Sequence, residues 1–264
     1  MSKGANLLTR VKKATVAVAY LNVQGSDQPF TIIGSGFCID PSGIVVTCRH
    51  VLEGFMAKPI AQQIAEASGE RTPGSLLPVS SGKIIVPHAI FYDTERSSEH
   101  IVAIPVPIQN ASAKTDKDIA ALQLLHHASF LEGYPFLEIE NYRELQEGDE
   151  IGVCGFPLGN HLFEQLGTVT SSFTKGILSS IIPGPNVSLE LLGGFQLNVT
   201  ATNGNSGGPV FSLISGRVFG VLTLGVNHPA GGLVHGLVKA EPVYPVAEPG
   251  FVERLRKAPE VMHR

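Results

Sequence analysis

The 264-residue sequence contains no tryptophan, only three cysteines and no long apolar run. A membrane-spanning helix needs about 18 or more consecutive apolar residues, so we predict none, and no apolar stretch behind the N-terminus indicates a secretory signal. The cysteines, Cys38, Cys48 and Cys154, are odd in number and lack the spacing of metal ligands. We therefore predict buried thiols in a reducing compartment, the cytoplasm, and no bound metal.

Charge is also sparse, because Asp, Glu, Lys and Arg make up 16% of the residues and the net charge is −4. The charged residues are scattered along the chain, so the sequence offers no basic face for nucleic acid and no polybasic run for a membrane surface. We expect neither of these partners and no cofactor. The oligomeric state stays open.

What the chain has instead is a series of short β-branched segments bounded by Gly, Pro and Asp, without long helical patterns. The segments are 15–21, 30–39, 44–48, 83–86, 101–106, 119–124, 151–155, 168–170, 176–181, 195–199, 210–214, 218–224 and 237–238. Roughly six strands on each side of a connector predict an all-β fold of two packed six-stranded antiparallel β-barrels with a short C-terminal helix at 251–257.

The expected organisation follows from these segments. It comprises an N-terminal extension (1–13), a first barrel (14–130), a connector (131–147) and a second barrel with the closing helix (148–264). The first barrel contains an insertion at about 53–100, in which composition favours a short helix at 55–67 and an exposed loop at 69–82.

One turn, NGNSGGP at 203–209, places a serine among glycines directly before an apolar run. Glycine tolerates backbone angles that other residues cannot adopt, so the chain can turn sharply here. Such a turn can direct two backbone N–H groups at one point, where they stabilise an oxyanion. We predict Ser206 Oγ as a nucleophile and the amides of Gly204 and Ser206 as an oxyanion hole. The plain alternative is a turn with an incidental serine.

Two further residues complete a candidate site. His50 ends a predicted hairpin, and Asp118 abuts the apolar run 119–124, where a carboxylate needs hydrogen bonds to offset its burial. In a serine triad the imidazole takes the proton of the serine, and the carboxylate holds the imidazole in the correct tautomer. We therefore predict a His50, Asp118 and Ser206 triad that works through an acyl-enzyme.

The segments around these residues resemble the trypsin-like serine peptidases, specifically the HtrA/Deg-type branch. They are GSGF (34–37), VVTCRHV (45–51), DIAAL (118–122), GFPLG (155–159), TVTS (168–171) and GNSGGP (204–209), within about residues 14–240. The resemblance implies a serine endopeptidase in which His and Asp come from the first barrel and Ser from the second. It also implies a substrate pocket walled by Thr200, Ala201, Thr202, Asn203, Thr223, Leu224 and Gly225.

The chain departs from that family in three places. A PDZ domain, which many Deg proteins carry, has no room here, and no cysteine follows His50 closely enough to form the disulfide of secreted relatives. The residue before Ser206 is Asn205, where secreted trypsins have an Asp that captures a newly cut N-terminus. We therefore expect control by loop ordering rather than by zymogen cleavage.

The expected pocket segments contain no carboxylate, so cleavage after Arg or Lys is not expected. We predict a protein or peptide substrate with a small to medium apolar residue before the scissile bond, although His228 and His235 leave open an acidic one. Two other functions also stay open. One is a catalytically silent barrel that binds peptides by strand addition. The other is an α/β-hydrolase esterase, because GNSGG fits G-x-S-x-G; that fold requires a helix after the serine and the order Ser, acid, His.

Overall fold

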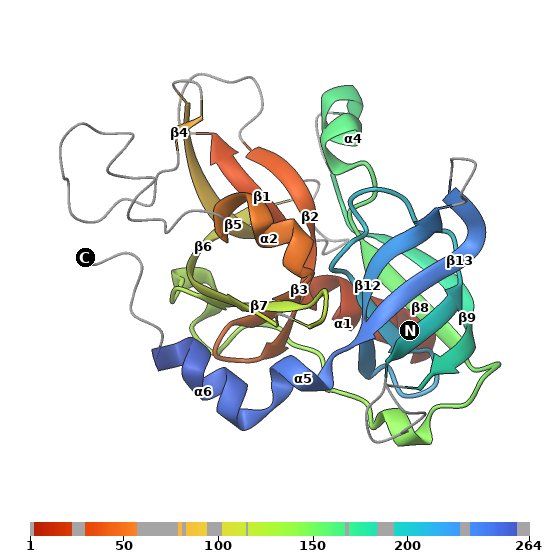
Figure 1. The fold of residues 1–264 in the computed structure, drawn as a ribbon. Coiled ribbons are helices and arrows are strands. Elements are labelled where there is room, and N and C mark those ends of the chain that lie inside the picture. Colours follow the sequence, from red (N-terminus) through yellow and green to blue (C-terminus); the bar gives the residue numbers. More distant parts are fainter. Residues whose placement is uncertain are drawn as a thin grey trace.

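The structure is a computed structural model that describes residues 3–22, 30–56, 79–80, 83–93, 102–114, 116–166, 169–183, 193–227 and 233–257. Its main elements are two antiparallel β-barrels, one from each half of the chain, so the predicted fold class is confirmed (Figure 1). Among the described residues, the helices are too short or too polar to cross a bilayer.

Six strands close the first barrel. They are β1 (Thr15–Asn22), β2 (Phe30–Asp40), β3 (Ile44–Thr47), β7 (Ala120–Leu124), β6 (Val102–Ala113) and β5 (Lys83–Asp93), and they are hydrogen-bonded in this order. Pairing of β1 with β5 completes the circle, and the short strand β4 (Val79–Ser80) extends from β5. Val16, Phe37 and Leu122 are fully buried in the core, because alternate side chains of each strand point into the barrel.

The second barrel is closed in the order β10-β13-β12-β11-β8-β9. Its strands are β8 (Glu150–Gly155), β9 (Ser172–Ile182), β10 (Gly194–Asn198), β11 (Pro209–Ser212), β12 (Val218–Asn227) and β13 (Leu233–Pro242). Ile151, Phe195 and Leu222 are fully buried in its core. The predicted strand at 168–170 is wrong: β9 begins at Ser172, and Val169 packs instead in an apolar cluster with Phe156.

The helices are short. In the described ranges they are α1 (Lys3–Ala14), α2 (Arg49–Met56), α4 (Gly159–Leu166), α5 (Tyr244–Ala247) and α6 (Pro249–Lys257), with 3₁₀ turns at Ala128–Phe130 and Tyr142–Glu144. The predicted closing helix is confirmed as α6. The expected N-terminal extension is helix α1, whose Val11 and Ala14 are fully buried. Most of the helix predicted at 55–67 and of the loop predicted at 69–82 lies outside the described residues.

Candidate active site

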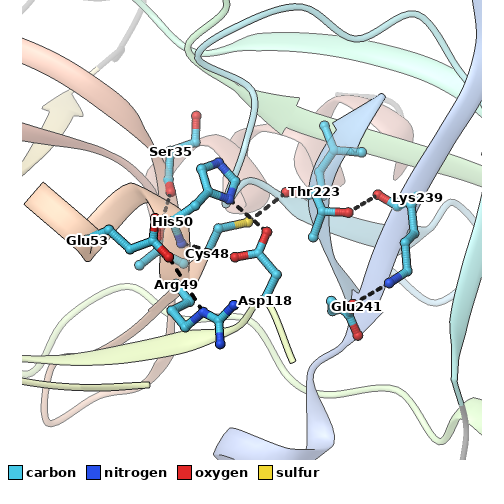
Figure 2. Close-up of polar contacts among 11 residues, drawn as sticks. Ser35, Cys48, Arg49, His50, Glu53, Asp118, Thr223, Lys239 and Glu241 are labelled. Atoms are coloured by element: carbon cyan, nitrogen blue, oxygen red, sulfur yellow. Dashed lines mark hydrogen bonds and ion pairs between the residues drawn. The ribbon is translucent and has the colours of Figure 1, made fainter. Parts of the chain in front are cut away.

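The first barrel brings His50 and Asp118 into direct contact. His50 lies in the first turn of α2, just after β3, and Asp118 lies just before β7. Because β3 pairs with β7, with Thr47 opposite Ala120, the two residues lie at the same end of the barrel. His50 Nδ1 is 2.7 Å from Asp118 Oδ2, and the backbone N–H of His50 donates to Asp118 Oδ1 at 3.0 Å (Figure 2). A carboxylate at Nδ1 favours the tautomer with the proton on Nδ1, so Nε2 is left as an acceptor.

These contacts also set the charge of Asp118. Burial by itself raises the pKa of a carboxyl group. Here the hydrogen bonds from the ring and the backbone N–H of His50, together with the positive charges nearby, outweigh burial and hold the pKa of Asp118 below its ordinary value. The carboxylate is therefore ionised at neutral pH and can stabilise a positively charged imidazole.

The turn that carries Ser206 packs tightly against the first barrel. Ser35 N–H of the first barrel donates to Ser206 O at 2.8 Å, whereas within the second barrel Gly207 N–H donates to Leu222 O at 2.7 Å. Gly207 has φ +89°, and a Cβ there would lie 2.0 Å from Ser35 O. Only glycine permits this conformation and this close approach, so the packing between the barrels requires the glycine that follows Ser206.

The amide of Gly204 is oriented by the peptide bond that precedes it. Leu158 N–H donates to Asn203 O at 2.8 Å, and in a planar trans peptide the N–H points away from the carbonyl oxygen. The Gly204 N–H is therefore directed away from Leu158. Leu158 itself has φ 50°, the only positive φ of a non-glycine residue in the described part of the chain.

The amide of Ser206 is oriented in the same way. Gly208 N–H donates to Asn205 O at 2.9 Å, so the N–H of the same peptide bond, that of Ser206, points in the opposite direction. Within the described residues, neither the Gly204 nor the Ser206 amide donates a hydrogen bond to a protein acceptor. Both are available to an external oxygen atom.

Gly34, on β2, lies close both to the serine turn and to α2, the helix that carries His50. A Cβ at Gly34 would lie 2.7 Å from a methyl group of Val51, the neighbour of His50, and 3.1 Å from Ser206 O. The serine turn and α2 therefore flank the same strand. Among the described residues, no hydrogen bond joins the Ser206 hydroxyl to the His50 ring. Catalytic hydrogen bonds are often long or poorly aligned before substrate binds.

Cys48 lies beside the pair, which the sequence analysis did not anticipate (Figure 2). The atoms of Cys48, His50 and Asp118 that could ligate a metal ion, a sulfur, a ring nitrogen and a carboxylate oxygen, lie within 4.8 Å of one another. Burial, and then the charge of Asp118, raise the pKa of the Cys48 thiol well above its usual range, and its Sγ donates to Leu222 O at 3.2 Å. A protonated, hydrogen-bonded thiol is a poor metal ligand. The predicted burial of all three cysteines is confirmed, and all are free thiols.

Glu241, on β13, is a second residue that the sequence analysis passed over. Its side chain is 5% exposed and is paired with Lys239 at 2.6 Å and with Lys117, the neighbour of Asp118, at 3.6 Å. The pair with Lys117 joins β13 of the second barrel to the loop that carries Asp118. A carboxylate and a lysine far apart in the chain leave no local signal that could have revealed this pairing.

The predicted pocket residues lie on two segments next to the serine turn. Thr200, Ala201, Thr202 and Asn203 follow β10 and lead into Gly204, and they are exposed or half-buried. Thr223, Leu224 and Gly225 lie on β12, directly after Leu222, which pairs with Gly207 and Gly208. The Thr223 side chain is buried and donates to Lys239 O at 2.8 Å. The side chain of Leu224, His228 and the side chain of His235 lie outside the described residues.

The α/β-hydrolase alternative is wrong. The residues after Ser206 form strand β11, not a helix, and the chain folds into two β-barrels. The catalytic order that this alternative requires is also reversed, because the histidine paired with a carboxylate precedes the serine.

The chain is similar to known proteins both in sequence and in fold. Residues 34–221 match the trypsin-like peptidase domain family. A DegP-like serine endoprotease of Rickettsia conorii, named as periplasmic, is 30% identical over 243 residues, which are 90% of this chain and 37% of that protein. A serine protease named HtrA-like from Staphylococcus haemolyticus is 29% identical over 134 residues, which are 48% of this chain and 19% of that protein.

Solved structures share the fold. The HtrA-type protease AlgW with a decapeptide superposes with a TM-score of 0.60 at 17% identity and covers 98% of this chain and 69% of the AlgW chain. Deg5 superposes with a TM-score of 0.58 at 17% identity, covering 94% and 93% of the two chains.

This chain spans little more than a third of the length of its Rickettsia relative. The periplasmic name of that relative does not support the cytoplasmic location expected from the sequence. The domain match, however, extends from within β2 to within β12, so it includes His50, Asp118 and Ser206. The chain belongs to the trypsin-like peptidase domain family.

Proposed function

We propose that this protein is a serine endopeptidase that hydrolyses peptide bonds through His50, Asp118 and Ser206. The observation that carries the proposal is the doubly hydrogen-bonded pair of His50 and Asp118. The helix that carries His50 packs at Val51 against Gly34 of β2, and Ser206 O approaches the same glycine. Two unpaired amides on that turn support it. The names of the relatives, serine endoproteases of DegP and HtrA type, agree with this activity.

In the proposed reaction, Ser206 Oγ attacks the carbonyl carbon of the scissile bond while His50 Nε2 takes the hydroxyl proton. The amides of Gly204 and Ser206 hold the negative oxygen of the tetrahedral intermediate. The carbon–nitrogen bond then breaks, and His50 gives its proton to the leaving amine, which leaves an ester on Ser206. Water attacks this ester with His50 again as base, and the acid product and the free serine are released. Asp118 stabilises the protonated imidazole throughout.

This function is tested by labelling with a serine-directed fluorophosphonate. We expect one label per chain, located at Ser206 by mass spectrometry, because only an activated serine reacts with this reagent. The Ser212→Ala variant, which removes a serine from β11 beyond the turn, should label like the wild type, whereas urea-unfolded protein should not. Peptide binding without any label would favour the catalytically silent barrel instead.

The substrate is proposed to be an extended peptide that pairs with the backbone of β12 at Thr223 and Gly225, with a small to medium apolar residue before the scissile bond. One of the structural neighbours carries a bound decapeptide. The buried carboxylate on the adjacent strand, Glu241, is already paired with Lys239 and Lys117, so it offers no free counter-charge for a basic substrate residue.

A peptide-library cleavage profile tests this preference. We expect apolar residues such as Val and Ala to dominate the position before the cut, with Arg and Lys depleted by at least about tenfold, which corresponds to about 1.4 kcal/mol in the transition state. A profile dominated by Arg or Lys would contradict the proposed pocket. Dominance of Asp or Glu would instead support a role for His228 or His235.

A further inference from the structure

Ser35, on β2 of the first barrel, is fully buried where the two barrels meet. Its hydroxyl donates to Gly204 O at 2.6 Å and accepts a hydrogen bond from Phe156 N–H at 2.9 Å. Its own N–H donates to Ser206 O at 2.8 Å. One residue of the first barrel thus contacts two separate segments of the second, the end of β8 and the serine turn.

The peptide bond held by the Ser35 hydroxyl lies between the two amides of the proposed oxyanion hole. Its carbonyl, Gly204 O, is bound by Ser35, and its N–H, from Asn205, donates to Thr202 O at 3.1 Å. Because a trans peptide is rigid and planar, fixing its two ends fixes the direction in which the chain enters and leaves it. The amide of Gly204 on one side and that of Ser206 on the other are thereby oriented.

The serine turn needs the hydrogen bond from Ser35 because Gly204 does not by itself restrict the backbone conformation. Gly204 has φ +95°, and a Cβ there would lie 2.3 Å from Phe156 O, so the position accepts only glycine. Glycine, however, populates many backbone conformations at similar energy. A hydrogen bond to its carbonyl from a buried side chain therefore selects one orientation out of several that the chain could adopt.

The absence of a side chain at Gly155 makes room for the Ser35 hydroxyl. A Cβ at Gly155 would lie 2.9 Å from Ser35 Oγ and 2.8 Å from Asn205 Oδ1, so the glycine leaves a slot in which the hydroxyl meets both backbone groups. Removing the hydroxyl would leave the Phe156 N–H and the Gly204 carbonyl without this partner in a buried environment, which is unfavourable unless the turn moves.

On the basis of the proposed function, we propose that Ser35 is a positioning residue for the oxyanion hole. It does not touch the substrate. Its hydroxyl holds the Gly204–Asn205 peptide so that the Gly204 and Ser206 amides converge on the reacting oxygen. The loss of this hydroxyl should therefore weaken transition-state binding more than substrate binding.

The test compares Ser35→Ala with a matched control, Ser212→Ala. The Ser212 hydroxyl also contacts two backbone groups, accepting from Ile214 N–H at 3.2 Å and Ser215 N–H at 3.3 Å, but at the far end of β11. We expect kcat of Ser35→Ala to fall about 10- to 100-fold, less than the 10²- to 10³-fold loss when an oxyanion donor is removed outright. KM should change less than about threefold. The inhibition constant of a peptidyl trifluoromethyl ketone, which forms an oxyanion on the serine, should rise in parallel with the fall in kcat/KM.

Ser212→Ala should keep wild-type kcat and inhibitor affinity. The proposal is overturned if Ser35→Ala keeps wild-type kcat and inhibitor affinity, or if only KM changes. If circular dichroism shows that Ser35→Ala is unfolded, the same comparison is made with Ser35→Cys, which keeps the side-chain shape but donates more weakly; unchanged kcat and inhibitor affinity there overturn the proposal equally. Failure of the proposed function is distinct, because the wild type itself would then neither turn over peptide nor accept the fluorophosphonate label.

Discussion

Replacing Ser206 with alanine is expected to lower kcat for peptide hydrolysis by about 10⁵- to 10⁶-fold, the scale seen when a triad nucleophile is removed. Without the hydroxyl no acyl-enzyme can form, and only direct attack by water, helped by the oxyanion hole, remains. Stability should change by less than about 1 kcal/mol, because within the described residues the Ser206 hydroxyl makes no hydrogen bond to the protein.

Steady-state turnover of a peptide substrate and a urea melt of the same preparation measure the two effects separately. Ser212→Ala serves as the control for purification and for the serine-to-alanine change itself. Turnover by Ser206→Ala within about tenfold of the wild type would remove Ser206 from its assigned role. A large loss of stability would instead show that the hydroxyl has a structural function.

The second large effect is expected from Asp118→Asn, which should lower kcat by about 10⁴-fold. The amide oxygen of asparagine can still accept the backbone N–H of His50, so the NH₂ group would face Nδ1, where the wild type has a carboxylate oxygen. An NH₂ donor facing Nδ1 forces the ring proton onto Nε2. His50 would then have no free lone pair with which to take the serine proton.

Asp116→Asn is the matched control, because Asp116 is exposed and lies two residues earlier in the same turn. This variant should keep kcat within about twofold, as expected for a surface change. If Asp118→Asn keeps more than a tenth of wild-type kcat, the carboxylate is not required for the tautomer, and the triad assignment is wrong at this position.

The same carboxylate makes a pH-dependent contribution to stability. The folded-state pKa of Asp118 is lowered, so its stabilising contribution is fully present above the unfolded value, near 3.9. The contribution is lost as the pH falls through the folded pKa, because the protonated acid no longer favours the His50 contacts. Thermal melts between pH 7 and pH 3 should therefore show wild type losing its advantage over Asp118→Asn only at the acid end.

Much of the barrel architecture could be predicted because its signals are local. The β-branched segments between Gly, Pro and Asp turns predict β1, β2 and β3 to within one residue at each end, since strand alternation and turn chemistry depend on neighbouring residues. The strand at 168–170 was wrong because Val169 is apolar for another reason, its packing beside Phe156. Helix α1 was missed, and it depends on Val11 and Ala14 being covered by the barrel.

For the site, the sequence alone determined the candidate residue types, their order and the requirement for glycine around Ser206. Only the tertiary structure decided which of them meet. Pairing of β3 with β7 brings His50 next to Asp118. Packing of the two barrels against each other brings Ser35 into contact with the serine turn, and Lys117 into an ion pair with Glu241. Contacts such as Ser35 with Gly204 join residues 169 positions apart. They arise when two closed sheets pack together, and no local pattern in the chain encodes that distance.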